Sequence, residues 1–293
     1  MIATAFTLAA ALVLAPQDAV APAPAAATAA APAADPAARA LWDAIVAAAA
    51  GSKTARATAF VLDFEATRYS GESQSNDVDA TYSYLEPGCV RVALVSGRQR
   101  LRGPDGDWLI DKAGAHRLVG RDFKQDIAEL DETVAVARTF AHLTDPRGLR
   151  LESLSRMSAP PPGLPEALRT KAAALDWLRL ESRDFRSPPV ARAGQAAELG
   201  PIDVLELGVD RATRAPRMAV LTDPLAPRGA IALGMLEDPL EVDGFRVPSR
   251  VTAWHVDAAL IPPAFAARAS LDLWLKSGTL RPKLSPEDFL PPR

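Results

Sequence analysis

The chain has 293 residues, of which 33 are Lys or Arg and 36 are Asp or Glu, so its formal net charge is −3. A charge this close to neutral gives no global attraction to nucleic acid or to acidic membranes, which argues against a nucleic-acid-binding protein. Cys89 is the single cysteine, so no disulfide can form within the chain. A lone thiol is usually a small buried hydrophobe, and a redox role is the less favoured alternative.

The N-terminal segment predicts export. Ile2–Leu14 is an apolar stretch of 13 residues, which is short for a membrane span and typical of a secretory signal peptide. Ala19-Val20-Ala21 then has the small-x-small pattern of a signal-peptidase site, although no Lys or Arg precedes the apolar stretch. We therefore expect a signal peptide at 1–21, with an uncleaved N-terminal anchor as the alternative. An Ala- and Pro-rich linker at 22–35 and one domain at 36–293 follow.

The domain is predicted to begin with a short helix and to continue as a mainly β fold. Asp35-Pro36 supplies an acidic N-cap and a proline at the first helical position, which indicates a helix over 36–50. Thr58–Tyr69 then alternates apolar and polar side chains, as a strand does in an antiparallel sheet with one apolar face. Similar patterns between turn residues predict strands over 78–84, 90–94, 98–102, 108–110, 116–119, 149–157, 177–185, 202–209, 217–222, 230–236, 245–256 and 269–275. Because some of these signals are weak, we expect about eleven strands in one curved sheet.

A long amphipathic helix is predicted over 122–143. One apolar stripe recurs along it at steps of four and three: Phe123, Ile127, Leu130, Val134, Ala137 and Ala141. Arg138 falls among the polar remainder. A single long helix in a β chain has to lay its stripe on the apolar face of the sheet. We therefore expect Phe60, Leu62 and Phe64 to face the same side as Ile127, Leu130 and Val134.

The last third of the chain contains two recognisable turns and a proline-rich tail. Asp210–Pro216 forms a hairpin turn built from Asp, Thr and Pro. Asp243-Gly244 opens a second turn before a strand. The tail at 280–292 (LRPKLSPEDFLPP) is expected not to be helical, because its four prolines interrupt the backbone hydrogen bonds. The stretch at 159–171 is predicted to be irregular with at most one helical turn, and the structure of 159–200 stays open.

The order of these elements resembles that of the LolA/LolB-like superfamily over about residues 37–292. The resemblance rests on the N-terminal helix, the meander, the interior helix, the Asp-Thr-Pro hairpin and the "D-G-x-x-x-P" turn with its closing "D-F-x-P-P". The Pro- and Arg-rich stretch at 159–200 departs from the pattern. The resemblance implies a curved antiparallel half-barrel, mainly β (α+β), whose concave face is covered by the amphipathic helix. It also implies a periplasmic carrier of acyl chains.

Motifs of catalysis and of cofactor binding do not occur in the sequence. There is no H-E-x-x-H, G-x-S-x-G, C-x-x-C, phosphate-binding loop or G-x-G-x-x-G. His116 and His255 lie in predicted strands, and His142 lies in the last turn of the long helix, where a cation favours the helix dipole. Asp77 and Asp79 lack the glycine and distal Glu of a calcium loop, so a solvated strand face is the favoured interpretation. We expect no enzyme, no metal and no cofactor.

Two features could bind a ligand. Arg98, Arg100 and Arg102 share one face of a strand, where they could meet lipid phosphates or an acidic partner. A solvated outer face paired with carboxylates of the neighbouring strand is the favoured interpretation. The other feature is the apolar face, which is either plain core or a cavity under the helix. The candidate ligand-binding residues are Phe60, Leu62, Phe64, Tyr82, Tyr84, Val92, Leu94, Ile127, Leu130 and Val134.

The sequence, taken with the resemblance, predicts an exported non-enzymatic carrier that binds lipid or lipoprotein acyl chains in the cell envelope. The helix would fill the cavity when it is empty and move when a chain enters. Envelope membrane proteins are further candidate partners. The alternative is a periplasmic protein-binding or sensor module with a packed core. A hydrolase is a third, less favoured possibility because no catalytic constellation is visible.

Overall fold

The computed structural model describes residues 35–50, 56–70, 73–86, 88–185, 202–222, 230–257 and 264–292. The expected signal peptide and all but the last residue of the expected linker lie outside these residues. Within the described ranges, no helix combines the length and the apolar composition that a membrane crossing requires. The helices are α1 (Pro36–Ala50), α2 (Lys124–Thr144) and α3 (Glu166–Ala173), with short 3-10 turns at Arg121–Phe123, Pro146–Gly148 and Pro286–Phe289.

The fold is mainly β, as the sequence predicted. Thirteen strands form one open antiparallel sheet in the order β6-β5-β4-β3-β2-β1-β14-β12-β11-β10-β9-β8-β7. The strands are β1 (Ala59–Ser70), β2 (Ser73–Leu85), β3 (Cys89–Leu94), β4 (Gln99–Gly103), β5 (Gly106–Asp111), β6 (Gly114–Arg117), β7 (Ser153–Met157), β8 (Asp176–Ser182), β9 (Asp203–Val209), β10 (Pro216–Thr222), β11 (Ala230–Val242), β12 (Phe245–Asp257) and β14 (Leu271–Thr279). The two-residue β13 (Ala264–Phe265) pairs only with β12. The expected number of about eleven was too low, because the weaker patterns also form strands and the two-residue β13 carries too little alternation to detect.

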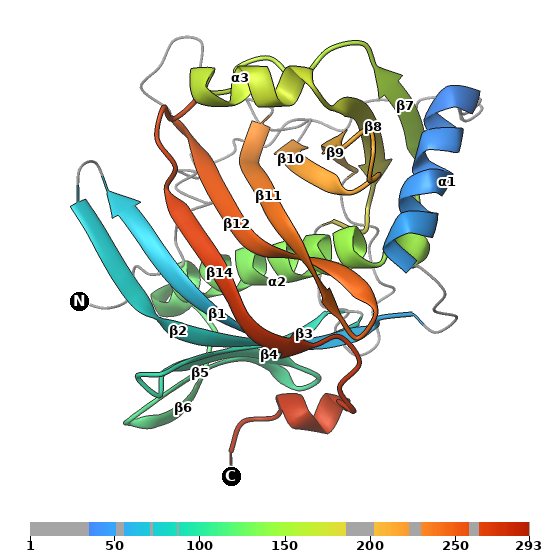
Figure 1. Ribbon diagram of the computed structural model, residues 1–293. Helices are drawn as coiled ribbons and strands as arrows, with labels where there is room; N and C mark the ends of the chain where they lie inside the picture. Colours follow the sequence, from blue (N-terminus) through green and yellow to red (C-terminus); the bar gives the residue numbers. More distant parts are fainter. Residues whose placement is uncertain are drawn as a thin grey trace, which may run out of the picture.

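The strand order explains why α2 crosses the sheet. Strands β1–β6 run from the centre to one edge, β7–β12 return from the opposite edge, and β14 joins the two halves by pairing with β1 and β12. The connection from β6 to β7 therefore has to span the sheet, and α2 has 21 residues, which extend about 30 Å. Figure 1 shows α2 running through the concave side, between the β1–β4 half and the β8–β12 half. The expected helix on the concave face is confirmed.

The apolar stripe of α2 packs on the predicted face of β1. One buried cluster contains apolar residues of both elements, namely Phe60, Leu62, Phe64, Leu130 and Val134, with Ile127 partly buried against it. Glu65, which points the other way, is exposed. The predicted register of β1 is therefore confirmed.

The second half of the sheet is covered on both faces. Leu178 of β8 packs with Trp42 and Ile45 of α1, while the adjacent Trp177 packs with Leu168 of α3 on the opposite face. Figure 1 places α1 beside β7 and α3 at the far end of β8–β12. The expectation of at most one helical turn near 159–171 was wrong: α3 is an eight-residue helix, formed because Leu168 and Ala172 can bury one apolar side.

The Asp243-Gly244 turn holds the end of β14 in place. Asp243 and Gly244 both have positive φ (50° and 80°), as a two-residue hairpin turn with the right-handed twist requires. The Asp243 carboxylate accepts hydrogen bonds from the Thr279 hydroxyl at 2.7 Å and from the Leu280 amide at 2.8 Å. The turn between β11 and β12 thereby holds the end of β14 in place.

The second predicted turn is also a hairpin, between β9 and β10. Asp210 accepts hydrogen bonds from the Thr213 amide at 2.7 Å and from the Thr213 hydroxyl at 2.9 Å. These bonds, of which the one from the Thr213 amide contributes most, lower the pKa of Asp210. The side chain that made the turn recognisable is therefore the one that stabilises it.

The proline-rich tail contains one 3-10 turn, Pro286–Phe289, so the expectation of no helical structure was wrong. Proline is compatible with the first position of such a turn, where no amide partner is needed. Asp288 accepts a hydrogen bond from the Ser285 amide at 2.8 Å. Phe289 is buried with Leu101 on the convex face. A Cβ at Gly103 would lie 1.9 Å from the Phe289 carbonyl oxygen, so the tail requires a glycine there.

Candidate ligand-binding site

The structure brings the ten predicted apolar residues together under α2. Eight of them are buried in one cluster, namely Phe60, Leu62, Phe64, Tyr82, Tyr84, Val92, Leu130 and Val134, and Leu94 and Ile127 are partly buried against it. The aromatic rings touch one another, with Phe60 and Tyr84 centroids 5.2 Å apart. Burial raises the pKa of Tyr84, so its hydroxyl stays protonated. In this arrangement the face is filled by side chains of α2.

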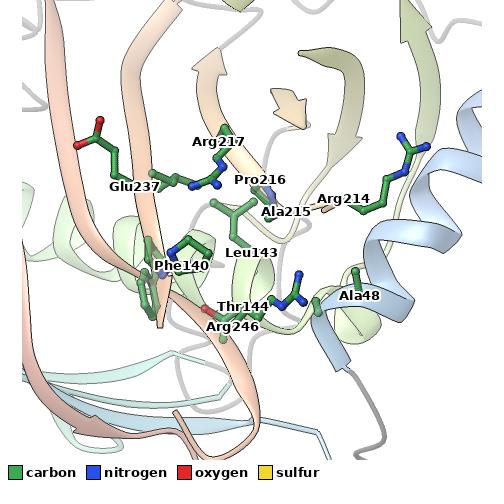
Figure 2. A pocket seen from close by; sticks show the side chains of 14 residues that line it. Ala48, Phe140, Leu143, Thr144, Arg214, Ala215, Pro216, Arg217, Glu237 and Arg246 are labelled. Carbon is green, nitrogen blue, oxygen red and sulfur yellow. The ribbon is translucent and has the colours of Figure 1, made fainter. Parts of the chain in front are cut away.

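A cavity lies beside this cluster, at the C-terminal half of α2 (Figure 2). Its volume is about 40 Å³, which is small beside the roughly 300–1,000 Å³ of pockets that bury a small molecule. The lining comes from α1, α2, the start of β10, and the adjoining parts of β11 and β12: Ala48, Ala49, Phe140, Leu143, Thr144, Arg214, Ala215, Pro216, Arg217, Leu236, Glu237, Pro239, Arg246 and Pro248. None of the ten predicted residues belongs to this lining.

Phe140 separates the cavity from the predicted apolar face. Its ring contacts Phe60, with centroids 5.5 Å apart, and Phe64, with centroids 6.4 Å apart. Leu143, on the other side of the cavity, packs with the cluster under α1. The cavity thus lies where the two halves of the core meet. The sequence contained a signal for Phe140, because this residue follows Ala137 at a helical spacing of three. The expected stripe went from Ala137 directly to Ala141 and therefore omitted it.

The arginines of β4 face α2, so the favoured interpretation of a solvated outer face was wrong. Arg100 and Arg102 are paired across the strands with Val92 and Val90 of the concave face. Arg98 and Arg100 each lie 3.4 Å from Asp126 in the first turn of α2. Arg102 pairs with Asp107 of β5 at 2.7 Å. The expected pairing with a carboxylate of a neighbouring strand is therefore found for this arginine. The contacts of Arg98 and Arg100 with Asp126 fix the N-terminal turn of α2 to the sheet.

Two polar residues of α2 are buried where the sequence predicted exposure. Arg138 was assigned to the polar side of the helix, yet it is 6% exposed and lies 3.8 Å from Asp184, which follows β8. His142 was expected to be a cation at the helix end. It is buried, and desolvation together with Arg138 lowers its pKa, so it is neutral at neutral pH. Asp184, which follows β8, lies close enough to act electrostatically on both residues.

Polar atoms under this end of α2 are incompletely satisfied. Within the described part of the chain, Thr139 Oγ1, His142 Nε2 and Thr144 Oγ1 are buried and form no hydrogen bond. A buried polar group without a partner costs about 1–3 kcal/mol. The C-terminal half of α2 is therefore held less favourably than an ordinary core helix, and this is the half that borders the cavity.

Other polar candidates do not assemble into a site. Among the described residues, no group of three or more His, Cys, Asp or Glu side chains could hold a metal ion. His116 is partly exposed beside Asp111, at 3.4 Å, and the side chain of His255 lies outside the described residues. Asp79 is exposed and pairs with Lys276 at 2.8 Å, as a solvated strand face should.

The cysteine is less buried than expected. Cys89 is a free thiol and is half-buried rather than fully enclosed. It packs at the edge of the convex-face cluster around Leu101. Burial raises the pKa of its thiol, which disfavours the reactive thiolate.

The chain is similar in structure to proteins of the LolA superfamily over most of its length. A LolA superfamily protein from Nitrosomonas europaea shares 14% identity, covering 86% of this chain and 97% of that one with a TM-score of 0.43. A domain named for outer membrane lipoprotein sorting, from Vibrio parahaemolyticus, shares 10% identity over 85% and 94% of the chains, with a TM-score of 0.45. A DUF1329 family protein from Desulfovibrio piger shares 11% identity over 86% and 97%, with a TM-score of 0.43. No family model and no curated protein matches the sequence.

Proposed function

We propose that the protein is an exported, non-enzymatic carrier that binds an acyl chain of a lipid or lipoprotein beneath α2. The observation that carries the proposal is the position of the cavity, which is separated from the aromatic concave face only by side chains such as Phe140. A chain that displaced this ring would continue onto the apolar face that α2 covers. The incompletely satisfied polar atoms at the same end of α2 support a helix that can move.

The energetics favour such a displacement. Each buried methylene contributes about 0.8 kcal/mol, so a chain of about 16 carbons could gain roughly 12 kcal/mol. This gain offsets the apolar contacts that α2 loses when its C-terminal half leaves the sheet. The carrier would work in the periplasm, where envelope membrane proteins would supply or receive the chain.

A second candidate is a protein-binding or sensor module with a permanently packed core. The observation that favours it is the close packing of the ten predicted residues, eight of which are buried against one another and α2. In this candidate the small cavity stays closed, and the exposed faces of the molecule make the functional contacts.

Binding of a fluorescent fatty-acyl probe to the wild-type protein and to Leu130→Glu tests the carrier. Leu130 is fully buried in the first half of α2. If α2 can leave the sheet, the variant stays folded and binds more probe. Leu168→Glu on α3, a residue that is also buried, is the matched control, and it should lose its melting transition because it buries an unpaired charge in ordinary core. If both variants unfold and the wild type binds no probe, the carrier is excluded and the packed protein-binding or sensor module remains as the candidate function.

Export is tested separately. We expect cleavage after Ala21, so that the N-terminus of the protein recovered from the cell envelope begins at Pro22. N-terminal sequencing of that fraction checks it. Recovery of a chain that retains Met1 in the membrane pellet would instead indicate an uncleaved anchor.

A further inference from the structure

The mouth of the cavity carries more positive charge than its neighbours neutralise. Three arginines and one glutamate line it, namely Arg214, Arg217, Arg246 and Glu237. Arg214 is neutralised by Asp176, at 3.2 Å. The Glu237 carboxylate is engaged elsewhere, because it pairs with Arg250 at 3.3 Å. Arg217 and Arg246 are thus the arginines of the lining that form no direct ion pair among the described residues.

Neither Arg217 nor Arg246 forms an ion pair among the described residues, although the charge of Arg217 helps to lower the pKa of Asp210 in the adjacent hairpin turn, after the hydrogen bonds that Asp210 accepts from Thr213. Arg246 donates to the Thr213 carbonyl at 3.4 Å, which leaves its charge intact. Glu241, its cross-strand neighbour, is exposed and forms no ion pair with it in this part of the chain.

Apart from Thr144, the remaining lining is apolar. Figure 2 shows the arginines around the apolar side chains of the lining, with Arg214 extending toward α1. Arg246 is exposed and Arg217 is half-buried, so solvent reaches the cationic part of the lining. A guanidinium group binds carboxylate or phosphate through two parallel hydrogen bonds. The cavity therefore combines a cationic entrance with an apolar interior.

We propose that the cavity selects acyl chains that carry an anionic headgroup, a carboxylate or a phosphate, which Arg217 and Arg246 bind while the chain passes between Phe140 and Leu143. This inference rests on the proposed carrier function and specifies its ligand class. An uncharged amphiphile with the same chain would leave both arginines without an anion. The arginines thus set specificity, and the apolar interior supplies chain affinity.

Calorimetric titration of the full chain with three probes tests the inference. Laurate has the chain and the charge, its glycerol monoester has the same chain without the charge, and acetate has the charge without the chain. We expect laurate to bind about tenfold or more tightly than the monoester, as for a charge-assisted contact, and acetate to bind too weakly to measure. Arg217→Gln combined with Arg246→Gln should abolish the preference for laurate and leave the affinity for the monoester unchanged.

Two control variants separate charge from folding. Arg268→Gln removes an exposed arginine in the turn before β14 and should keep the preference. Arg217→Lys combined with Arg246→Lys keeps both charges and should retain most of it. Equal binding of laurate and the monoester to the wild type would overturn the anionic selectivity and leave the carrier intact. Acetate binding as tightly as laurate would also overturn the inference, because the chain would then contribute nothing. Failure of both acyl probes would overturn the carrier and the inference together.

Discussion

Replacement of Phe140 by Ala tests whether the cavity and the concave face can become one space. The change removes the ring that contacts Phe60 at 5.5 Å and Phe64 at 6.4 Å between centroids. A Phe→Ala change in a core costs about 3–5 kcal/mol of stability. Because Phe140 is only partly buried, we expect about 2–3 kcal/mol. For a chain of this size that corresponds to a melting temperature lower by about 4–12 °C.

The carrier predicts that an acyl chain restores much of this loss. The space left by the ring connects the cavity of about 40 Å³ with the apolar face, so laurate should bind more tightly to Phe140→Ala than to the wild type. A ligand at about 100 times its dissociation constant stabilises a protein by about 2.7 kcal/mol, which is close to the expected loss. The assay is the melting temperature of each protein, measured with and without laurate.

Phe289→Ala is the matched control for this experiment. Phe289 is buried with Leu101 and Ile110 on the convex face. Its replacement should lower the melting temperature, and laurate should not raise that temperature again. The reasoning is refuted if laurate shifts both variants equally. It is also refuted if laurate fails to shift Phe140→Ala, because the space opened beneath α2 would then be unable to accept a chain.

Three further predictions concern α2 and β14. Because burial and Arg138 lower the pKa of His142 from 6.5, the unfolded chain binds its proton more readily. Stability should therefore be full above about pH 7 and fall as the pH drops through 6.5, and His142→Gln should flatten this dependence in melts between about pH 7 and 5. Asp126→Asn removes the carboxylate that Arg98 contacts at 3.4 Å, so it should cost about 1 kcal/mol and speed probe uptake in stopped-flow fluorescence. Asp272→Ala removes a buried carboxylate that binds Arg250 at 2.8 Å and accepts a hydrogen bond from the Thr252 hydroxyl. The change leaves Arg250 paired with Glu237 and should cost about 1.5–3 kcal/mol in urea unfolding; a loss below about 1 kcal/mol would contradict this.

Local patterns were sufficient to predict much of the fold. The alternation in β1 and the three–four spacing in α2 are set by backbone geometry within a few residues, so they identified both elements and the faces that meet. Asp243 and Gly244 were recognisable as a turn for the same reason, since positive φ is a local requirement. The ten predicted residues were brought together because each belonged to one of these regular patterns.

The features that form the candidate site depended on long-range pairing. The insertion of β14 between β1 and β12 joins residues more than 200 positions apart in sequence, and no local pattern encodes it. Arg138 lies beside Asp184 of the segment that follows β8, and Arg98 and Arg100 meet Asp126 of α2. The cavity arises where α1, α2 and β10–β12 meet. The sequence by itself determined which faces are apolar, and only the tertiary structure decided which segments cover them, because covering a face is an interaction between distant parts of the chain.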